Sequence, residues 1–124
     1  MNPKVGDGKI PVRLVYICSP YRAGPNRTVE QNVLLAKRLC KAALNAGFAP
    51  FASHLLYTQF LDDKNESDRK NGIAAALRFV EVCDQIWVFD YLGISDGMRA
   101  EIDRATELGM PVFFRPAAWK GIWS

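Results

Sequence analysis

Residues 83–112, CDQIWVFDYLGISDGMRAEIDRATELGMPV, decide the fold, because they place a strand, a loop and a helix in immediate succession. Residues 85–90 (QIWVFD) are a short run of apolar, β-branched and aromatic side chains, which predicts a buried strand. Residues 95–108 predict a helix with Ser95 as its N-cap, and a glycine and a proline follow its last turn. Residues 112–114 then predict another strand.

The sequence before this stretch predicts the same alternation of strand and helix. Residues 12–18 (VRLVYIC) have the pattern of a buried parallel strand, and residues 48–51 predict a short second strand. Between them Thr28 begins a helix, because Gln31 completes the pattern of a capping box, and Gly47 suits the C-terminal cap. The buried face of this helix is expected to carry apolar residues at helical spacing: Val29, Val33, Ala36, Cys40 and Ala43.

The part of the chain between the second and third strands is harder to interpret. Residues 52–64 show no clear period, and a polar stretch over residues 62–71 is expected to lead into another helix. Ile73, Leu77 and Val80 recur at helical spacing and are expected to share one face of that helix.

Strands that alternate with helices in this way imply right-handed crossovers and a parallel sheet. The expected fold is α/β, a small doubly wound parallel sheet of Rossmann or flavodoxin type, with four or five strands and helices on both faces. Residues 1–11 contain proline and glycine without periodicity, and we expect a flexible lead-in. Residues 12–124 have the length of one domain.

The composition excludes several classes of protein. The 124 residues are 49% hydrophobic and 23% charged, as in globular chains. No apolar run approaches the ~18 residues of a membrane span, and the start lacks the apolar stretch of a signal peptide, so we expect a cytoplasmic protein with no membrane partner. The net charge of +3 is small and scattered, which argues against binding a nucleic-acid polymer. Cys18, Cys40 and Cys83 lie in apolar sequence and indicate reduced core residues, with no disulfide or metal site.

Ligands of doubly wound folds bind beyond the carboxyl ends of the strands, which selects residues 19–26, 52–57 and 91–97. In the first of these loops Ser19 and Arg22 offer a hydroxyl and a guanidinium just ahead of a helix, which suits an anion. The alternative is an ordinary strand-to-helix loop with a solvated Arg22. The sequence has neither a GxxxxGK[ST] phosphate loop nor a GxGxxG fingerprint, and we expect no cofactor.

In the helix predicted over residues 95–108, Glu101 lies close to the apolar side. The buried face of that helix is expected to consist of Met98, Ile102, Ala105 and Leu108. At ~100° per residue, Glu101 falls only ~45° from the centre of this stripe. A carboxylate that faces a sheet needs a partner or a purpose. It is either a nucleophile or base beneath the ligand, or a boundary glutamate paired with a nearby arginine.

Other polar and aromatic residues near the strand ends allow weaker interpretations. His54, the single histidine, follows the second strand and either joins the site or only caps a loop. Asp90 ends the third strand, where a receiver-type phosphoacceptor could lie, but the first strand is not followed by the acidic pair that receivers need. The tryptophans are expected to be core or interface residues: Trp87, Trp119 and Trp123.

Two segments resemble the nucleoside 2-deoxyribosyltransferase-like superfamily, which includes the 2'-deoxynucleoside 5'-phosphate N-hydrolases. The first is YICSPYRAG at residues 16–24, and the second combines CDQIWVFD, ISDGMRAEIDRA and GMPV between residues 83 and 112. The resemblance covers residues 12–115 and looks closest to the small bacterial and phage members of the group. It implies an enzyme that cleaves the N-glycosidic bond of a (deoxy)ribonucleotide, by hydrolysis or by ribosyl transfer.

The resemblance also implies roles for individual residues. Glu101 matches the catalytic glutamate, which attacks the anomeric carbon, and Tyr16 matches the tyrosine that orients it. Arg22 and its loop match phosphate-binding positions. Ser95 matches a serine that holds the 5'-phosphate in the hydrolases, where the transferases carry an aspartate. Neighbouring residues are expected to complete the substrate site: Ser19, Gly24, His54, Asp96, Gly97 and Met98.

One departure from the family pattern supports a second hypothesis. The family places an aspartate in the helix before the third strand to protonate the leaving base, but residues 72–77 contain no acid. Asp68 lies early for this role and Asp84 looks structural, so either His54 or Asp96 substitutes, or catalysis is weak or absent. The alternative function is a non-catalytic nucleotide-binding protein that senses or sequesters its ligand.

The resemblance also implies a homodimer or a higher homo-oligomer, since small members of the superfamily complete their sites across subunits. The apolar chain end agrees with this expectation, because it carries Trp119, Ile122 and Trp123.

Overall fold

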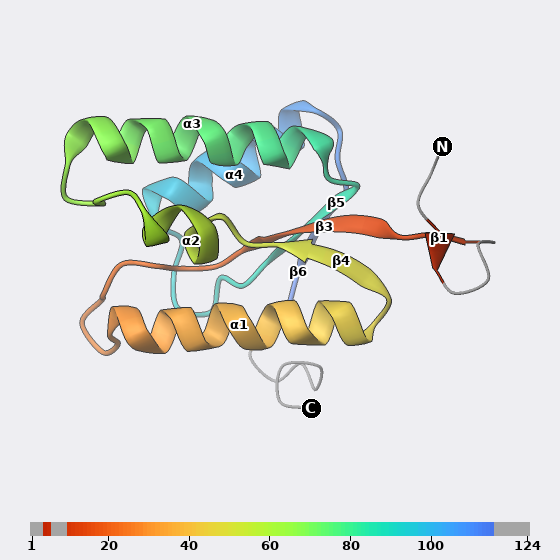
Figure 1. Cartoon of the computed structure of the whole chain (residues 1–124), viewed down its shortest axis with the longest axis horizontal. Coiled ribbons are helices and arrows are strands. Elements are labelled where there is room, and N and C mark those ends of the chain that lie inside the picture. Colours follow the sequence, from red (N-terminus) through yellow and green to blue (C-terminus); the bar gives the residue numbers. More distant parts are fainter. Residues whose placement is uncertain (1–3, 6–9, 116–124) are drawn as a thin grey trace.

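The computed structural model describes residues 4–5 and 10–115, and its centre is a four-stranded parallel sheet (Figure 1). The strands lie in the order β4-β3-β5-β6. Their bounds are Arg13–Cys18 for β3, Phe48–Phe51 for β4, Gln85–Val88 for β5 and Val112–Phe114 for β6. In chain order this is the arrangement 2-1-3-4, which is the flavodoxin-like order of doubly wound sheets. The predicted fold class is confirmed.

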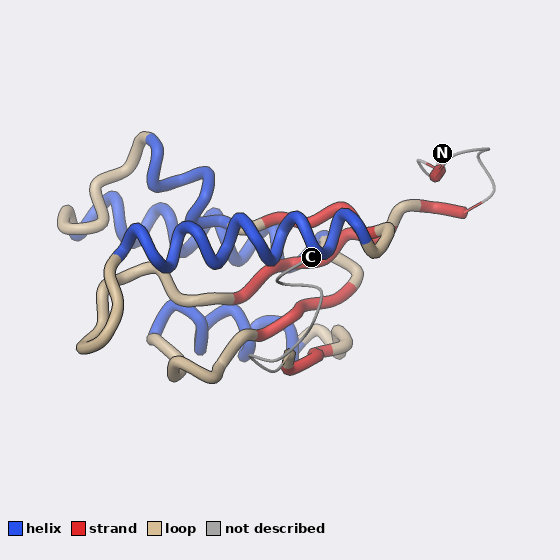
Figure 2. The backbone as a smooth tube through the Cα atoms, turned by 90° about the horizontal axis from the view of Figure 1, so that it is seen from below, coloured by secondary structure: helices blue, strands red, loops and turns tan. Residues whose placement is uncertain are grey.

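Helices cover both faces of the sheet. Helix α1 (Val29–Asn45) lies on one face, and α3 (Glu66–Val82) and α4 (Asp96–Glu107) lie on the other (Figure 1). Figure 2, seen from the side of α1, shows this helix lying across the strands. Two short elements, α2 (Ser53–Leu56) and the 3-10 helix η1 (Tyr57–Gln59), connect β4 to α3.

The side chains of β3 alternate between the two faces, which builds two separate apolar clusters. Val15 and Ile17 pack with α1, whereas Tyr16 and Cys18 pack in the cluster that contains residues of α3 and α4. All four side chains are buried. Since successive side chains of a strand point to opposite faces, the register of β3 directs the Tyr16 hydroxyl beneath α4. Trp87 of β5 lies in the α1 cluster, as expected for a core residue.

Helix α1 begins as predicted but is rotated relative to its predicted face. Thr28 and Gln31 form the reciprocal bonds of a capping box, and Gly47 has a φ of 93° just after the helix. The residues that are buried along the helix are Asn32, Leu35, Ala36, Leu39, Ala42 and Ala43. Of the predicted face, Ala36 and Ala43 are confirmed as buried, whereas Val29, Val33 and Cys40 are only half-buried. The apolar pattern gave an incomplete face because it could not include the polar Asn32, which is buried on the inward side of the helix.

Two element boundaries and the exposure of one residue differ from the sequence predictions. The polar stretch over residues 62–71 is partly helical, because Asn65 caps α3 and the helix already starts at Glu66. Strand β5 ends at Val88, two residues before the predicted end at position 90. Leu108, predicted to be buried, is 45% exposed because it is the C-cap residue of α4.

Further expectations concern the chain start and the cysteines. Residues 4–5 and 10–11, within the predicted flexible lead-in, pair as the short antiparallel strands β1 (Lys4–Val5) and β2 (Ile10–Pro11). That residues 1–11 are flexible stays a prediction.

The three cysteines are free thiols, as expected. No helix among the described residues is long and apolar enough to cross a membrane. Trp119, Ile122 and Trp123 lie outside the described residues.

Candidate functional site

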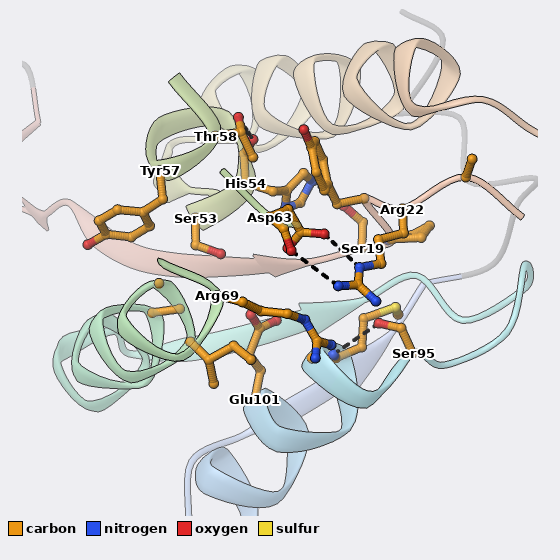
Figure 3. A pocket seen from close by; sticks show the side chains of 18 of the residues that line it. Ser19, Arg22, Ser53, His54, Tyr57, Thr58, Asp63, Arg69, Ser95 and Glu101 are labelled. Carbon is orange, nitrogen blue, oxygen red and sulfur yellow. Dashed lines mark hydrogen bonds and ion pairs between the residues drawn. The ribbon is translucent and has the colours of Figure 1, made fainter. Parts of the chain in front are cut away.

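A cavity of about 380 Å³ lies at the carboxyl ends of β3 and β5. The chain leaves β3 towards β4 on one side and later returns to β5 on the other, so the loops after these two strands diverge and leave a crevice between them. The loop after β3, the α2–η1 segment, α3 and the start of α4 line this cavity (Figure 3).

Glu101 and Tyr16 form the polar floor of the cavity. The Tyr16 hydroxyl donates to Oε2 of Glu101 at 2.7 Å, and its oxygen lies 2.9 Å from Oγ of Ser53. Because a phenol has one proton, Tyr16 donates to the carboxylate and accepts from the serine. Tyr16 and Ser53 are buried. A three-membered chain of hydrogen bonds therefore fixes the carboxylate relative to β3.

The environment of Glu101 favours its neutral form. Burial raises the pKa of Glu101 to about 7, although hydrogen bonding to Tyr16 and Cys18 opposes the shift. Burial, together with the negative charge of Glu101, raises the pKa of Tyr16 well above its usual value. Within the described residues no ion pair includes Glu101, so the alternative of a boundary glutamate paired with an arginine has no support.

His54 belongs to the cavity and is uncharged near neutral pH. Its Nε2 lies 3.2 Å from Oγ of Ser19, and its ring lies beside that of Tyr21, with 6.0 Å between centroids. Burial lowers the pKa of His54 to about 4. The imidazole can therefore orient Ser19 or a ligand, but it holds no extra proton to donate at pH 7.

The loop after β3 is held by Asn32, which sequence reasoning did not identify. The Asn32 side-chain amide donates to the carbonyl oxygens of Tyr21 and Arg22, at 3.0 Å and 2.9 Å. Its Oδ1 accepts from Nε of Arg27 at 2.9 Å. Gly24 allows this close packing, since a Cβ there would lie 3.2 Å from the Arg27 guanidinium. The buried asparagine of α1 thus shapes one wall of the cavity.

Arg22 reaches the cavity but already has an anionic partner. Its Nε lies 2.6 Å from Oδ2 of Asp63, and Nη2 donates to the Asp63 carbonyl at 3.4 Å (Figure 3). The Arg22 side chain is 56% exposed and that of Asp63 is 37% exposed. The pair joins two loops across the cavity.

Ser95 caps α4, where its Oγ accepts from the backbone N–H of Met98 at 3.2 Å.

Most residues predicted for the site line the cavity: Ser19, Arg22, Gly24, His54, Ser95, Gly97, Met98 and Glu101. Tyr16 does not line the cavity itself but is hydrogen-bonded to Glu101, which does. Asp96 is exposed at the start of α4 and is not among the lining residues.

Several polar residues of the cavity wall were not predicted as site members. They include Arg27, Ser53, Thr58, Asp63, Asp68 and Arg69. Asp68 does reach the cavity, and its Oδ2 accepts from the backbone N–H of Asp62 at 2.9 Å. Ser53 lies within the loop selected at residues 52–57 but was not singled out there, and Arg69 lies in a polar run that carried no signal for the site. Asp84, by contrast, is structural as expected, because its Oδ2 accepts from the backbone N–H of Leu14.

The cavity contains no evident metal centre. Among the residues that the structure describes, no group of three or more histidine, cysteine or acidic side chains could hold an ion.

Comparison with known proteins bears on the fold and on the family. A solved structure of 2-deoxyribosyltransferase from the psychrotolerant bacterium Bacillus psychrosaccharolyticus is similar, with a TM-score of 0.63 and 15% sequence identity, over 83% of this chain and 72% of that chain. At this low identity, the structural similarity shows a shared fold and no more. No curated protein sequence matches the chain. Residues 13–115, from β3 to the residue after β6, match one family along their whole length, and the chain belongs to that family, the Domain of unknown function (DUF7768).

Proposed function

We propose that this protein cleaves the N-glycosidic bond of a (deoxy)ribonucleotide, with Glu101 as the nucleophile. One observation carries the proposal: a buried carboxylate, 2.7 Å from the Tyr16 hydroxyl, faces the cavity at the carboxyl ends of the strands. The fold is shared with a 2-deoxyribosyltransferase, which supports a substrate of the nucleoside class.

The proposed reaction needs an ionised Glu101. The carboxylate forms a bond to C1' of the sugar while the C1'–N bond breaks, and the base leaves with the bonding electrons and takes up a proton. Water then attacks C1', which regenerates the carboxylate and releases the sugar phosphate; in a transferase, a second base replaces the water. The fixed negative charge stabilises the oxocarbenium-like transition state. Tyr16 keeps the reacting oxygen in position.

A specific observation favours the alternative, a protein that binds a nucleotide without cleaving it. The leaving base needs a proton, and the two expected substitutes for the missing aspartate are poorly suited to supply one. His54 is neutral at pH 7, and Asp96 lies outside the cavity lining. Slow or absent base release is the consequence if no other group supplies the proton.

The experiment that separates these functions compares the wild type with Glu101→Gln. Each protein is incubated with a panel of nucleoside 5'-monophosphates and nucleosides, and released base is measured by chromatography. If Glu101 is the nucleophile, its loss should lower base release by about 1,000-fold or more, with ligand affinity little changed.

A matched control is Asp103→Asn, because Asp103 is an exposed acid on the same helix. It should retain base release. Undiminished release in Glu101→Gln would end the assignment of the nucleophile. Tight binding without release by the wild type would instead establish the alternative.

A further inference from the structure

Arg69 differs from the other two arginines that line the cavity. Arg22 is paired with Asp63, and the Nε of Arg27 donates to Asn32. Arg69 is half-buried on α3, and no side-chain hydrogen bond or ion pair of its guanidinium occurs among the residues that the structure describes. A guanidinium that lines a cavity and has no partner from the protein can bind the oxygens of an anionic ligand.

The carboxylates of the cavity wall all have other partners. Asp63 binds Arg22, Asp68 accepts from the backbone N–H of Asp62, and Glu101 accepts from Tyr16. None lies within ion-pair distance of the Arg69 guanidinium in the described part of the chain. The positive charge of Arg69 therefore remains available to an anionic group from outside the protein.

The direction of the side chain places this charge within the site. Figure 3 shows Arg69 extending from α3 towards the part of the cavity where Glu101 and Ser95 lie. A guanidinium binds the oxygens of a phosphate with two parallel hydrogen bonds, whereas a neutral nucleoside offers no comparable charged partner. The cavity volume of about 380 Å³ is at the small end of ligand pockets, which suits one mononucleotide better than a dinucleotide.

We infer that Arg69 selects for a phosphorylated ligand by binding the phosphate of a nucleoside monophosphate from the α3 side of the cavity. The inference rests on the proposed function for the nature of the ligand, but it concerns binding and not bond cleavage. It assigns to α3 a residue that distinguishes a nucleotide from a nucleoside.

The test compares four proteins: wild type, Arg69→Gln, Arg69→Lys and Lys70→Gln. Lys70 is exposed and adjacent on α3, so its substitution removes the same charge away from the cavity. Titration calorimetry measures affinity for inorganic phosphate, for the four 2'-deoxynucleoside 5'-monophosphates and for the corresponding nucleosides. Thermal melting verifies that each variant is folded.

Arg69→Gln should weaken the best-bound monophosphate by about 10- to 100-fold, the range expected for a charge-assisted contact, and leave nucleoside affinity within about twofold. Arg69→Lys should retain part of the difference, and Lys70→Gln should resemble the wild type. Equal weakening of nucleoside and monophosphate, no weakening of either, or no monophosphate binding by the wild type would overturn the inference.

The result for Arg69 can be distinguished from the result for the proposed function. Loss of phosphate selectivity in Arg69→Gln supports the inference even if the wild type releases no base. Base release with selectivity unchanged in Arg69→Gln overturns the role of Arg69 and leaves the proposed function standing.

Discussion

The carboxyl group of Glu101 is placed where its charge has an energetic cost. It is held by the hydroxyl of Tyr16, which in turn accepts from Ser53, and none of these partners carries a positive charge. Burial raises the pKa of Glu101 from 4.5 to about 7. A residue kept in such a position, with hydrogen bonds that fix its direction, has the properties expected of a group poised to react.

This shift predicts a pH-dependent difference in stability between the wild type and Glu101→Gln. Between pH 4.5 and 7 the folded state keeps a proton that the unfolded state loses, so the favourable contribution is complete below pH 4.5 and is lost as pH rises through 7. The free energy of unfolding of Glu101→Gln minus that of the wild type should therefore rise by about 3 kcal/mol from pH 4 to pH 8.

Urea denaturation of both proteins at pH 4 and pH 8 measures this difference. The low pKa of His54 acts in the opposite sense, because stability falls from pH 6.5 to about 4, where the unfolded state takes up a proton that folded His54 does not. This effect is common to both proteins and cancels. If the variant gains no stability relative to the wild type between pH 4 and pH 8, the Glu101 charge has a favourable partner and the expectation is contradicted.

The pairing of Arg22 with Asp63 predicts opposite effects for two substitutions. Asp63→Asn removes the carboxylate that competes for the guanidinium and should strengthen binding of nucleoside monophosphates. Arg22→Ala should weaken that binding by about tenfold, at the lower end for a charged contact because the arginine is 56% exposed. Calorimetric titration checks both, and nucleosides should bind all three proteins alike. If both substitutions weaken the monophosphate, Arg22 is not a ligand contact.

At the scale of elements, the cavity depends on helix α1 as much as on the strands. Asn32 is 1% exposed and bonds two carbonyl oxygens of the loop after β3 as well as Arg27. Removal of its amide leaves these partly buried groups without their partner. The loop that carries Ser19 and Arg22 therefore depends on one side chain of the helix that follows it.

Asn32→Ala should accordingly lower the free energy of unfolding by about 2–4 kcal/mol and should weaken ligand binding through the loop. Gln31→Ala is the control, because Gln31 is exposed and contributes only to the capping box, so its loss should cost about 1 kcal/mol or less. Denaturation curves measure both. Equal, small losses would show that water replaces the asparagine.

Sequence patterns predicted the elements that are long or periodic, and failed where tertiary contacts decide. The helix after β5 was predicted with its N-cap and with Glu101 near the inward face, because local spacing determines both. The face of α1 was predicted only in part: Ala36 and Ala43 are buried as expected, but the polar Asn32 is also buried there. Ser53 and Arg69 were missed because their roles arise from segments that are distant in sequence and meet only in the folded chain.

At the scale of the whole molecule, one surface is unusually aromatic. Phe51 of β4 stacks on Phe79 of α3 with 4.2 Å between ring centroids, and Tyr57 lies near both. Phe79 is 39% exposed, and the nearby Phe60 is 65% exposed. Exposed aromatic side chains grouped in this way are typical of surfaces that associate.

We expect this surface and the apolar chain end to support a homodimer, so sedimentation at micromolar concentration should show a species of about twice 13.9 kDa. Phe60→Asp should shift the protein towards monomer. Leu44→Asp, at an exposed position near the end of α1, should leave the dimer intact. A single species of 13.9 kDa for the wild type would contradict the expectation.

The contact between Arg22 and Asp63 also has a kinetic consequence. It connects residues 41 positions apart over the cavity through two partly exposed side chains. Ion pairs of this kind contribute only about 0–1 kcal/mol, which is comparable to thermal energy. We therefore expect this ion pair to break and re-form without help from the ligand. Ions in solution screen it over a Debye length of about 8 Å at physiological ionic strength, so the rate of ligand exchange should depend on salt.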